Sequence, residues 1–451
     1  MRALILNPPS SSAVFRDHYC ASEAKSAYLW HPLDLLIQAA CLREAGWELT
    51  ALDAVATRMS LLEVLRDVDP AQFDLAVVLV SERTWSSDVQ VLRHLRSAGR
   101  IRIAASGDFL RFGSGPMEEA RPLVDWILTD FTTPHLPKTF DTGAPVGLGI
   151  ATPEAVMAGA FADMGRAPLD YPTPDLNLFG TDLYRLPYPG FTRFASVLSG
   201  YGCPYHCLYC HVGELGYRLR PVDAIIAELS RARQQGARQV YFRDATINAR
   251  RKHLLTWTRA MVDAGLDMPW AAFATAAPLD DEMAAAMRAS GCEHLQIGVE
   301  TLDEALRTKN GKPFDDAAHH AFVATCHAHD IEVTAHLVLG LPGETEATMA
   351  RTVDGLVDAG FDYVAVNLAE DRPGIPWRKQ DVGLVVKPTG GEGAHTDGPN
   401  LAELKRWQSL AYRRFYLRPR RLAQEAVSRL ENRDFGDALG LMKDVARWWS
   451  A

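Results

Sequence analysis

Three cysteines stand close together near the middle of the chain, at Cys203, Cys207 and Cys210. The CxxxCxxC spacing puts three thiols on one short loop, where all of them can face the same point. Thiolates are the usual ligands of iron–sulfur clusters, and three of them leave one iron of a four-iron cluster without a protein ligand. An iron with an open position can bind a small chelating molecule, as the open position of a catalytic zinc binds substrate. We therefore interpret this loop as the holder of a redox-active 4Fe–4S cluster.

The alternative interpretations of the loop are a zinc knuckle and a chance grouping. Zinc sites usually take four ligands in two pairs. His206 lies inside the cysteine loop, and the sequence has no matching second pair of ligands. In a long cytosolic chain, crowded cysteines indicate metal or redox chemistry rather than a disulfide framework. The other cysteines are isolated and receive no role, because single cysteines commonly pack as small apolar residues. They are Cys20, Cys41, Cys292 and Cys326.

The cysteine loop follows the first strand of a regular alternation of strands and helices. The predicted strands lie at residues 193–198, 239–243, 270–275, 294–300, 332–339 and 363–368. The predicted helices lie at residues 222–235, 250–264, 280–289, 315–328 and 346–359. Six β/α units are two short of a closed barrel, so we expect a partial, open (β/α)6 TIM barrel whose site lies at the carboxyl ends of its strands.

An earlier alternation of the same kind begins at the first residues. The predicted strands are residues 3–6, 48–52, 75–80, 101–105 and 126–128, with helices at 33–44 and 87–97. Such alternation predicts an α/β fold, here a doubly wound, Rossmann-like parallel sheet covered on both faces. Ligands of open α/β sheets bind at the carboxyl ends of the strands.

These patterns divide the chain into four predicted segments. Residues 1–131 form the first α/β domain, and residues 132–190, rich in proline and glycine, form a connector largely without regular structure. Residues 191–383 form the partial barrel. Residues 384–451 form a C-terminal helical region, whose helices begin near Leu401.

The barrel segment resembles the radical S-adenosylmethionine (SAM) superfamily over about residues 191–380. CxxxCxxC after the first strand of a six-unit β/α repeat carries the resemblance, supported by Gln296-Ile297-Gly298-Val299-Glu300-Thr301 and Leu339-Gly340-Leu341-Pro342-Gly343-Glu344. In that family the open iron chelates the amino and carboxylate groups of SAM. Reductive cleavage then yields a 5′-deoxyadenosyl radical. The resemblance thus implies a radical SAM enzyme.

The resemblance also implies which residues meet SAM. Tyr209 matches the aromatic whose backbone contacts the adenine, and Glu300 is the polar member of the fourth-strand motif that contacts the nucleoside. Asp244 occupies the second-strand position where many relatives carry acidic residues, and Gly340 and Pro342 lie in the turn after strand five. Simpler interpretations are that Asp244 caps a helix and that Gly340 and Pro342 only shape the turn.

The first segment resembles the cobalamin-binding domain that precedes many radical SAM enzymes. Asn7-Pro8-Pro9, His31-Pro32-Leu33 and Leu42-Arg43-Glu44-Ala45-Gly46 carry that resemblance. Residues 413–419 are similar to the tail of the group that includes the anaerobic magnesium-protoporphyrin cyclase and the class B methyltransferases. One departure is that the DxHxxG motif, which supplies an axial histidine in many cobalamin proteins, is missing, since His18 follows Asp17 directly.

Two hypotheses for this domain remain. Either cobalamin binds with its corrin at loops 81–85 and 106–108, or the domain is a scaffold with an empty cleft. With cobalamin, the resemblance implies methylation of an unactivated carbon or phosphorus centre in a small-molecule biosynthetic intermediate. Without it, radical cyclisation, oxidation or rearrangement is the alternative, and a non-catalytic iron–sulfur partner protein is another.

The composition of the chain argues against some classes of binding partner. The net charge of −9 argues against a protein built mainly to bind nucleic acid. No stretch reaches the length of a membrane span, and the first apolar run is too short for a signal peptide. We expect a cytoplasmic enzyme that acts on a small molecule and takes electrons from an external one-electron reductant of the flavodoxin or ferredoxin type.

Overall fold

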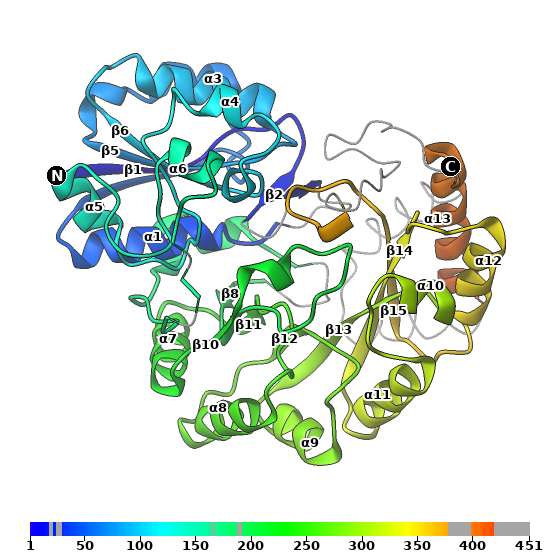
Figure 1. Ribbon diagram of the computed structural model, residues 1–451. Coiled ribbons are helices and arrows are strands. Elements are labelled where there is room, and N and C mark those ends of the chain that lie inside the picture. The colour runs from blue at the N-terminus through cyan, green and yellow to red at the C-terminus, as the bar shows by residue number, and fades with distance from the viewer. Residues whose placement is uncertain are drawn as a thin grey trace. The chain divides into compact units, whose positions relative to one another are not determined.

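The computed structural model contains two compact units (Figure 1). The first comprises Met1–Gly202 and Glu214–Arg243, and the second comprises Cys203–Gly213 and Asp244–Ala451. The structure describes residues 1–17, 21–23, 29–162, 164–165, 167–186, 192–377 and 398–418. His18, Cys20 and most of the predicted C-terminal region 384–451 therefore lie outside the described residues. The four predicted segment boundaries stay a prediction.

A parallel five-stranded sheet forms the centre of the first unit, in the order β4-β1-β5-β6-β7. Its strands are β1 Arg2–Asn7, β4 Glu48–Asp53, β5 Leu75–Val80, β6 Arg102–Gly107 and β7 Trp126–Ile127. In the register of β1, Leu4 lies opposite Thr50 on one side and Ala76 on the other. Every residue of β5 is buried, as its apolar sequence predicts for a central strand of a covered parallel sheet. The predicted Rossmann-like α/β sheet is confirmed.

Helices cover both faces of this sheet. Figure 1 shows α3 (Trp85–Arg96) and α4 (Met117–Ala120) on one side, and α1 (Leu33–Glu44) and α5 (Leu136–Thr142) on the other. Ten consecutive residues of α1, Leu33 through Leu42, are buried. This burial explains why α1 shows no polar face in the sequence.

The predicted connector is more regular than expected. Besides α5, it contains α6 (Pro153–Met157), which begins where the Thr152 hydroxyl accepts a hydrogen bond from the N–H of Ala155. These two short helices were not predicted, but the described part of residues 132–190 is otherwise largely without regular structure. Each spans only one or two turns, so neither could show the 3.6-residue period from which helices are predicted. Thr-Pro at an N-cap was the available signal.

The second parallel sheet has the strand order β15-β14-β13-β12-β11-β8, which confirms six strands. Its strands are β8 Phe194–Val197, β11 Gln239–Phe242, β12 Trp270–Ala274, β13 Cys292–Glu300, β14 Glu332–Leu339 and β15 Tyr363–Leu368. The first compact unit contains β8 and β11, which pair in parallel, and the second contains β12 to β15. In that second unit Ile297 of β13 lies opposite Ala274 of β12 and Ala335 of β14.

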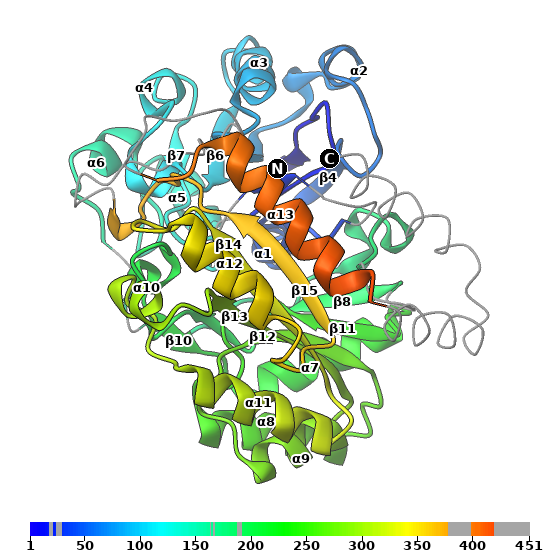
Figure 2. The ribbon, with the colours of Figure 1, turned by 90° about the vertical axis from the view of Figure 1, so that its right-hand side faces the viewer.

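The helices follow the predicted order with two differences. They are α7 Val222–Gln234, α8 Arg251–Asp263, α9 Asp281–Ala289, α10 Glu304–Lys309, α11 Asp316–Ala328, α12 Glu346–Gly355 and α13 Leu401–Tyr416. Helix α10 was not predicted, and α12 ends four residues before the predicted Ala359. Figure 2 shows α12 and α13 side by side along β14 and β15. Within the described part of the chain, no helix is long and apolar enough to cross a membrane.

Candidate cluster site

The cysteine loop belongs to the second unit. Cys203, Cys207 and Cys210 are free thiols, each half-buried. Burial raises the pKa of Cys203 to about 11 and that of Cys210 to about 12, and the negative charge of neighbouring cysteines adds to both shifts. Thiols with such pKa values stay protonated at neutral pH unless a metal ion displaces the proton. Without a metal ion, this environment disfavours the thiolate and therefore a nucleophilic role for these cysteines.

Backbone hydrogen bonds hold the loop in place between its second and third cysteines. The N–H of Leu208 donates to the carbonyl of Asn310 at 3.1 Å, and the carbonyl of Leu208 accepts from the N–H of Trp377 at 3.2 Å. The N–H of Cys210 donates to the carbonyl of Cys207 at 3.1 Å. The loop is therefore anchored on both sides to later segments of its own unit.

Aromatic side chains fix the same loop. The ring of Tyr209 packs against Trp377 with 5.8 Å between centroids. The ring of Tyr205 meets Phe314 edge-on at 5.2 Å, and its hydroxyl donates to the carbonyl of Ala277 at 3.1 Å. Tyr209 is thus a packing residue of the loop through its side chain, which leaves its predicted backbone contact to adenine as a prediction.

Glu300 forms a buried ion pair beside the cysteines. Its Oε1 lies 3.1 Å from Nζ of Lys312, and the two side chains are 10% and 8% exposed. Burial lowers the pKa of Lys312, but the Glu300 carboxylate and Cys207 outweigh that effect and raise it overall. Lys312 in turn lowers the pKa of Cys203 and Cys207 against the dominant effect of burial. Glu300, Lys312 and the thiols therefore form one electrostatic group.

The backbone around Glu300 is specialised. Glu300 has φ of 66°, in the left-handed region that residues with a Cβ rarely adopt, and the pairing of β13 with β14 shifts between Gly298 and Glu300. A Cβ at Gly298 would lie 2.2 Å from Oε1 of Glu300 and 2.8 Å from Nζ of Lys312. Gly298 thus leaves the space that the ion pair fills.

The turn after β14 is held by a buried carboxylate. Oε2 of Glu344 accepts the N–H groups of Gly340 and Leu341. Gly340 has φ of 90°, and a Cβ there would lie 2.9 Å from Leu404 of α13. These contacts support the interpretation that Gly340 shapes the turn. Leu341 packs in one apolar cluster with Leu208 and Tyr209, so the turn that contains Gly340 and Pro342 lies against the cysteine loop.

Asp244 is buried just beyond the carboxyl end of β11. The next helix, α8, starts at Arg251 with Arg250 as its N-cap, so the interpretation of Asp244 as the cap of that helix is wrong. Its contact with cofactor stays a prediction.

The zinc alternative gains no support from the geometry. Across the residues that the structure describes, no three His, Cys, Asp or Glu side chains are grouped as ligands of one metal ion. Lys312 is the residue that sequence reasoning missed, because nothing in its local sequence marks it.

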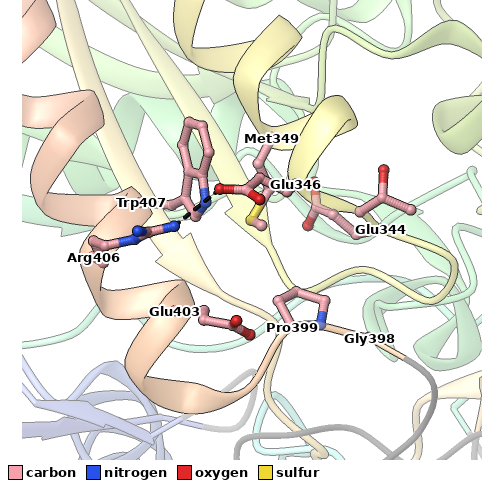
Figure 3. Close-up of a pocket in the computed structure, with 9 residues that line it drawn as sticks. Glu344, Glu346, Met349, Gly398, Pro399, Glu403, Arg406 and Trp407 are labelled. Carbon is pink, nitrogen blue, oxygen red and sulfur yellow. Dashed lines mark hydrogen bonds and ion pairs between the residues drawn. The ribbon is translucent and has the colours of Figure 1, made fainter.

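A cavity of about 300 Å³ lies elsewhere in the second unit, between the start of α12 and α13 (Figure 3). Its rim carries the exposed ion pair of Arg406 and Glu346, 3.0 Å apart, and Trp407 forms part of its wall. None of the cysteines or predicted SAM contacts is among its lining residues.

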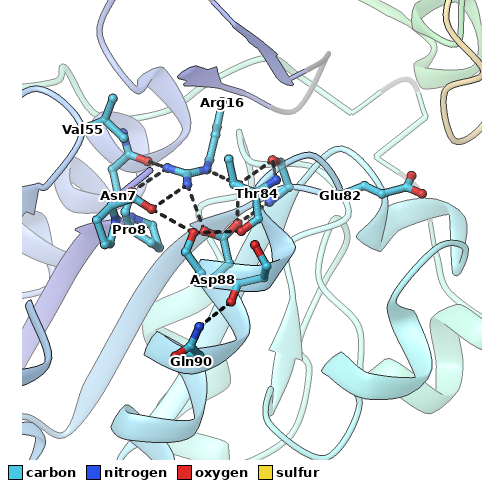
Figure 4. Close-up of polar contacts among 12 residues, drawn as sticks. Asn7, Pro8, Arg16, Val55, Glu82, Thr84, Asp88 and Gln90 are labelled. Atoms are coloured by element: carbon cyan, nitrogen blue, oxygen red, sulfur yellow. Dashed lines mark hydrogen bonds and ion pairs between the residues drawn. The ribbon is translucent and has the colours of Figure 1, made fainter. Parts of the chain in front are cut away.

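The carboxyl edge of the first sheet has its own polar network (Figure 4). Strand order reverses between β1 and β5, the position where related open sheets bind ligands. Arg16, 1% exposed, fills this point. Its guanidinium donates to Oδ1 of Asn7 and the carbonyl of Pro8 at 2.7 Å, to Thr84 at 2.8 Å and to Asp88 at 2.9 Å.

The two loops predicted to face a corrin lie at this same edge. Ser81 and Thr84 bond each other at 2.8 Å, and Ser106 donates to Asp34 at 2.6 Å. Asp108 accepts the N–H of Glu82 at 3.2 Å, which ties one loop to the other. The loops after β5 and β6 are therefore linked by hydrogen bonds among largely buried side chains, and Arg16 fills the position between the ends of β1 and β5.

Comparison with known proteins agrees with this architecture. Residues 197–356 match the model of the Radical SAM superfamily. An uncharacterized methyltransferase of Pyrococcus horikoshii is 24% identical over 268 residues, covering 57% of this chain and 58% of the relative. Tryptophan 2-C-methyltransferase of Streptomyces laurentii is 27% identical over 180 residues, covering 36% of this chain and 30% of the relative. The matches thus span only part of each relative.

Two solved structures share the fold. TsrM from Kitasatospora setae, a radical SAM methyltransferase determined with cobalamin and a [4Fe-4S] cluster bound, has a TM-score of 0.64 at 17% identity. That comparison covers 83% of this chain and 73% of TsrM. OxsB, a cobalamin-dependent SAM radical enzyme, has a TM-score of 0.61 at 13% identity and covers 81% of this chain and 53% of OxsB. At these identities the likeness shows the fold alone.

Proposed function

We propose that this chain, whose residues 197–356 match the model of the Radical SAM superfamily, is a cobalamin-dependent radical SAM methyltransferase. Its substrate is a small-molecule biosynthetic intermediate with an unactivated carbon or phosphorus centre. The observation that carries the proposal is the loop of three free, half-buried thiols beside the buried pair of Glu300 and Lys312.

Cys203, Cys207 and Cys210 hold the cluster in this proposal. A 4Fe–4S cluster with three protein ligands supplies one electron and an open iron for the reductive cleavage of SAM. The high pKa values of the thiols mean that the metal must displace their protons, so assembly releases protons. The backbone bonds of Leu208 keep the loop in one conformation through assembly.

SAM lies against the residues that surround this loop. Glu300 accepts hydrogen bonds from the ribose hydroxyls or the methionine ammonium, and charge-assisted bonds of this kind are the strong ones. The backbone of Tyr209, the turn with Gly340 and Pro342, and Asp244 beyond β11 complete the proposed contacts. The protein orients the radical carbon toward the substrate and excludes water and oxygen.

Cobalamin is assigned to the carboxyl edge of the first sheet, where it would carry the methyl group. Loops 81–85 and 106–108 would hold it, since hydrogen bonds already fix both loops at this edge. Arg16 fills the position between the ends of β1 and β5, so the cofactor would lie over these loops and not between the two strands. The fold of TsrM and OxsB supports this assignment.

The same arginine favours a second candidate function. Arg16 fills the position between β1 and β5 where a cofactor of this fold would enter, and without a cofactor the first unit is only a scaffold. In that case the enzyme performs radical cyclisation, oxidation or rearrangement without methyl transfer. An enzyme of either kind needs one electron from an external reductant of the flavodoxin or ferredoxin type. The intact set of three thiols argues against the non-catalytic alternative.

One anaerobic experiment separates these proposals. Protein reconstituted with iron and sulfide is reduced and incubated with SAM and candidate metabolites, with and without cobalamin. Formation of 5′-deoxyadenosine identifies radical chemistry, and a methylated product that depends on cobalamin identifies methyl transfer. A variant with Cys203, Cys207 and Cys210 all changed to alanine is the control, and 5′-deoxyadenosine formed by that variant would refute the cluster assignment.

A further inference from the structure

We propose that Lys312 is a positioning residue that sets the reduction potential of the cluster, by holding one fixed positive charge against the three cysteine ligands. The inference rests on the proposed function, because it requires a cluster at the cysteine loop. Neither the family motifs nor the predicted site residues include Lys312.

The ammonium group of Lys312 is confined on several sides. Glu300 binds it at 3.1 Å, and the lysine side chain is only 8% exposed. The ring of Phe314 lies 5.9 Å from Nζ, and a Cβ at Gly298 would come within 2.8 Å of it. A lysine confined in this way cannot swing out to solvent, so its charge stays at one place.

The segment before Lys312 is attached to the cysteine loop itself. The carbonyl of Asn310 accepts the N–H of Leu208 at 3.1 Å. Gly311 has φ of 73°, and a Cβ there would lie 3.5 Å from the carbonyl oxygen of His206. The cysteine loop and residues 310–312 are therefore in contact along their backbones, so a shift of one segment moves the other.

Reduction makes the cluster more negative. The oxidised cluster takes up one electron from the external reductant, [4Fe–4S]²⁺ + e⁻ → [4Fe–4S]⁺, while its three thiolates remain bound. A fixed, buried positive charge that interacts with the ligand thiols stabilises the reduced form more than the oxidised form. Lys312 should therefore raise the potential, and Glu300 should partly offset it. The balance between the two charges makes the cluster reducible by a physiological donor.

The test is a redox titration of the reconstituted protein followed by electron paramagnetic resonance. In Lys312→Met we expect the equilibrium constant for one-electron reduction to fall at least tenfold, which is about 59 mV at one electron. Lys312→Arg keeps the charge and should stay within threefold of wild type. Lys312→Met combined with Glu300→Gln removes both charges, so its potential should return toward the wild-type value.

Lys309→Met is the matched control. It makes the same charge change three residues earlier, at the last residue of α10, where the ammonium lies near Gly343 and not among the groups that shift the cysteine pKa values. Its potential should match that of wild type. An unchanged potential in Lys312→Met with full iron content, or an equal fall in Lys309→Met, would overturn the inference.

The double variant keeps the test valid if Lys312→Met fails to fold. Lys312→Met alone leaves a buried carboxylate without its partner, which destabilises proteins strongly, whereas removal of both charges avoids this. If Lys312→Met loses iron, the double variant is compared with Glu300→Gln alone, since these two proteins differ only at Lys312. Equal reduction potentials in the two proteins would refute the role of Lys312. A wild-type protein that binds no cluster would refute the proposed function itself.

Discussion

At the scale of single residues, Glu300 combines backbone strain, burial and charge at the carboxyl end of β13. Non-glycine residues in the left-handed region persist where the surrounding structure holds them, and such strain collects at functional sites. The contact with Lys312 at 3.1 Å fixes the side chain before any ligand arrives. Glu300 is therefore held in one position, as its proposed contact with SAM requires.

We predict that Glu300→Gln weakens the binding of SAM roughly ten- to hundredfold, since charge-assisted hydrogen bonds contribute about 1.5–3 kcal/mol. The amide keeps an acceptor for Lys312, and no cluster ligand changes, so iron content should stay at the wild-type level. Equilibrium titration with SAM and thermal unfolding of the same sample give both quantities. An unchanged dissociation constant with a lower melting temperature would remove Glu300 from the site.

Glu344 gives a prediction about pH. Burial raises its pKa to about 7 from an ordinary 4.5, against the lowering effect of the Gly340 and Leu341 N–H groups. Between these values the folded protein holds a proton that the unfolded chain has lost. The free energy of unfolding should therefore fall as the pH rises from 4.5 to 7, by about 3 kcal/mol at most, and then level off.

Glu344→Gln cannot ionise, so it should lose this pH dependence. Denaturant unfolding of both proteins at several pH values between 4.5 and 8 measures the difference, which should grow up to pH 7. Glu346→Gln, at a neighbouring exposed position, is the control and should follow wild type. Parallel curves for wild type and Glu344→Gln would show that Glu344 stays ionised in the folded protein.

At the scale of elements, α13 covers the exposed edge of the second sheet. Strand β15 is an edge strand, and edge strands expose N–H and C=O groups. The hydroxyl of Tyr412 accepts the N–H of Val366 at 3.0 Å, and that of Tyr416 accepts the N–H of Val364 at 3.0 Å. Each hydroxyl also donates to the carbonyl of the same valine. The helix thus takes the place of a further strand.

We predict that changing Tyr412 and Tyr416 together to phenylalanine loosens this edge. Each lost hydroxyl should cost about 1 kcal/mol, because water can only partly replace it. Hydrogen exchange of the Val364 and Val366 amides should become faster, as a local measure that does not assume two-state unfolding. Tyr363→Phe, whose hydroxyl reaches the exposed Glu332 at 3.4 Å, should leave these amides unchanged. Equal exchange in all proteins would contradict the proposed edge protection.

The sequence predicts the regular elements because buried parallel strands are continuous apolar runs and the longer helices have a clear period. It predicts the cysteine loop because the three ligands are close in the chain. It does not predict the ion pair of Glu300 with Lys312, which depends on the register shift in β13 and on the turn at Gly311. Nor does it predict the three-residue strands Val14–Arg16 and Ala21–Glu23, which are too short to show alternation.

At the scale of the whole molecule, the function depends on whether the first unit binds cobalamin. Its fold is suitable, but His31 is not placed to coordinate cobalt. His31 is 1% exposed and packs against Tyr184 at 4.3 Å and Phe194 at 4.8 Å between ring centroids. Burial lowers the pKa of His31 to about 3, so it is a neutral core residue. His18 lies outside the described residues.

We therefore predict that hydroxocobalamin forms a stoichiometric complex in which no protein histidine coordinates the cobalt. Electron paramagnetic resonance of the reduced cob(II)alamin complex should show no nitrogen superhyperfine splitting from a protein ligand. His18→Ala should give the same spectrum and the same affinity, because the DxHxxG motif that would make this residue an axial ligand is missing. Splitting that disappears in His18→Ala would identify His18 as the ligand after all. Failure of the wild-type protein to bind cobalamin would instead make the first unit a scaffold with Arg16 between the ends of β1 and β5, and would favour radical cyclisation, oxidation or rearrangement over methyl transfer.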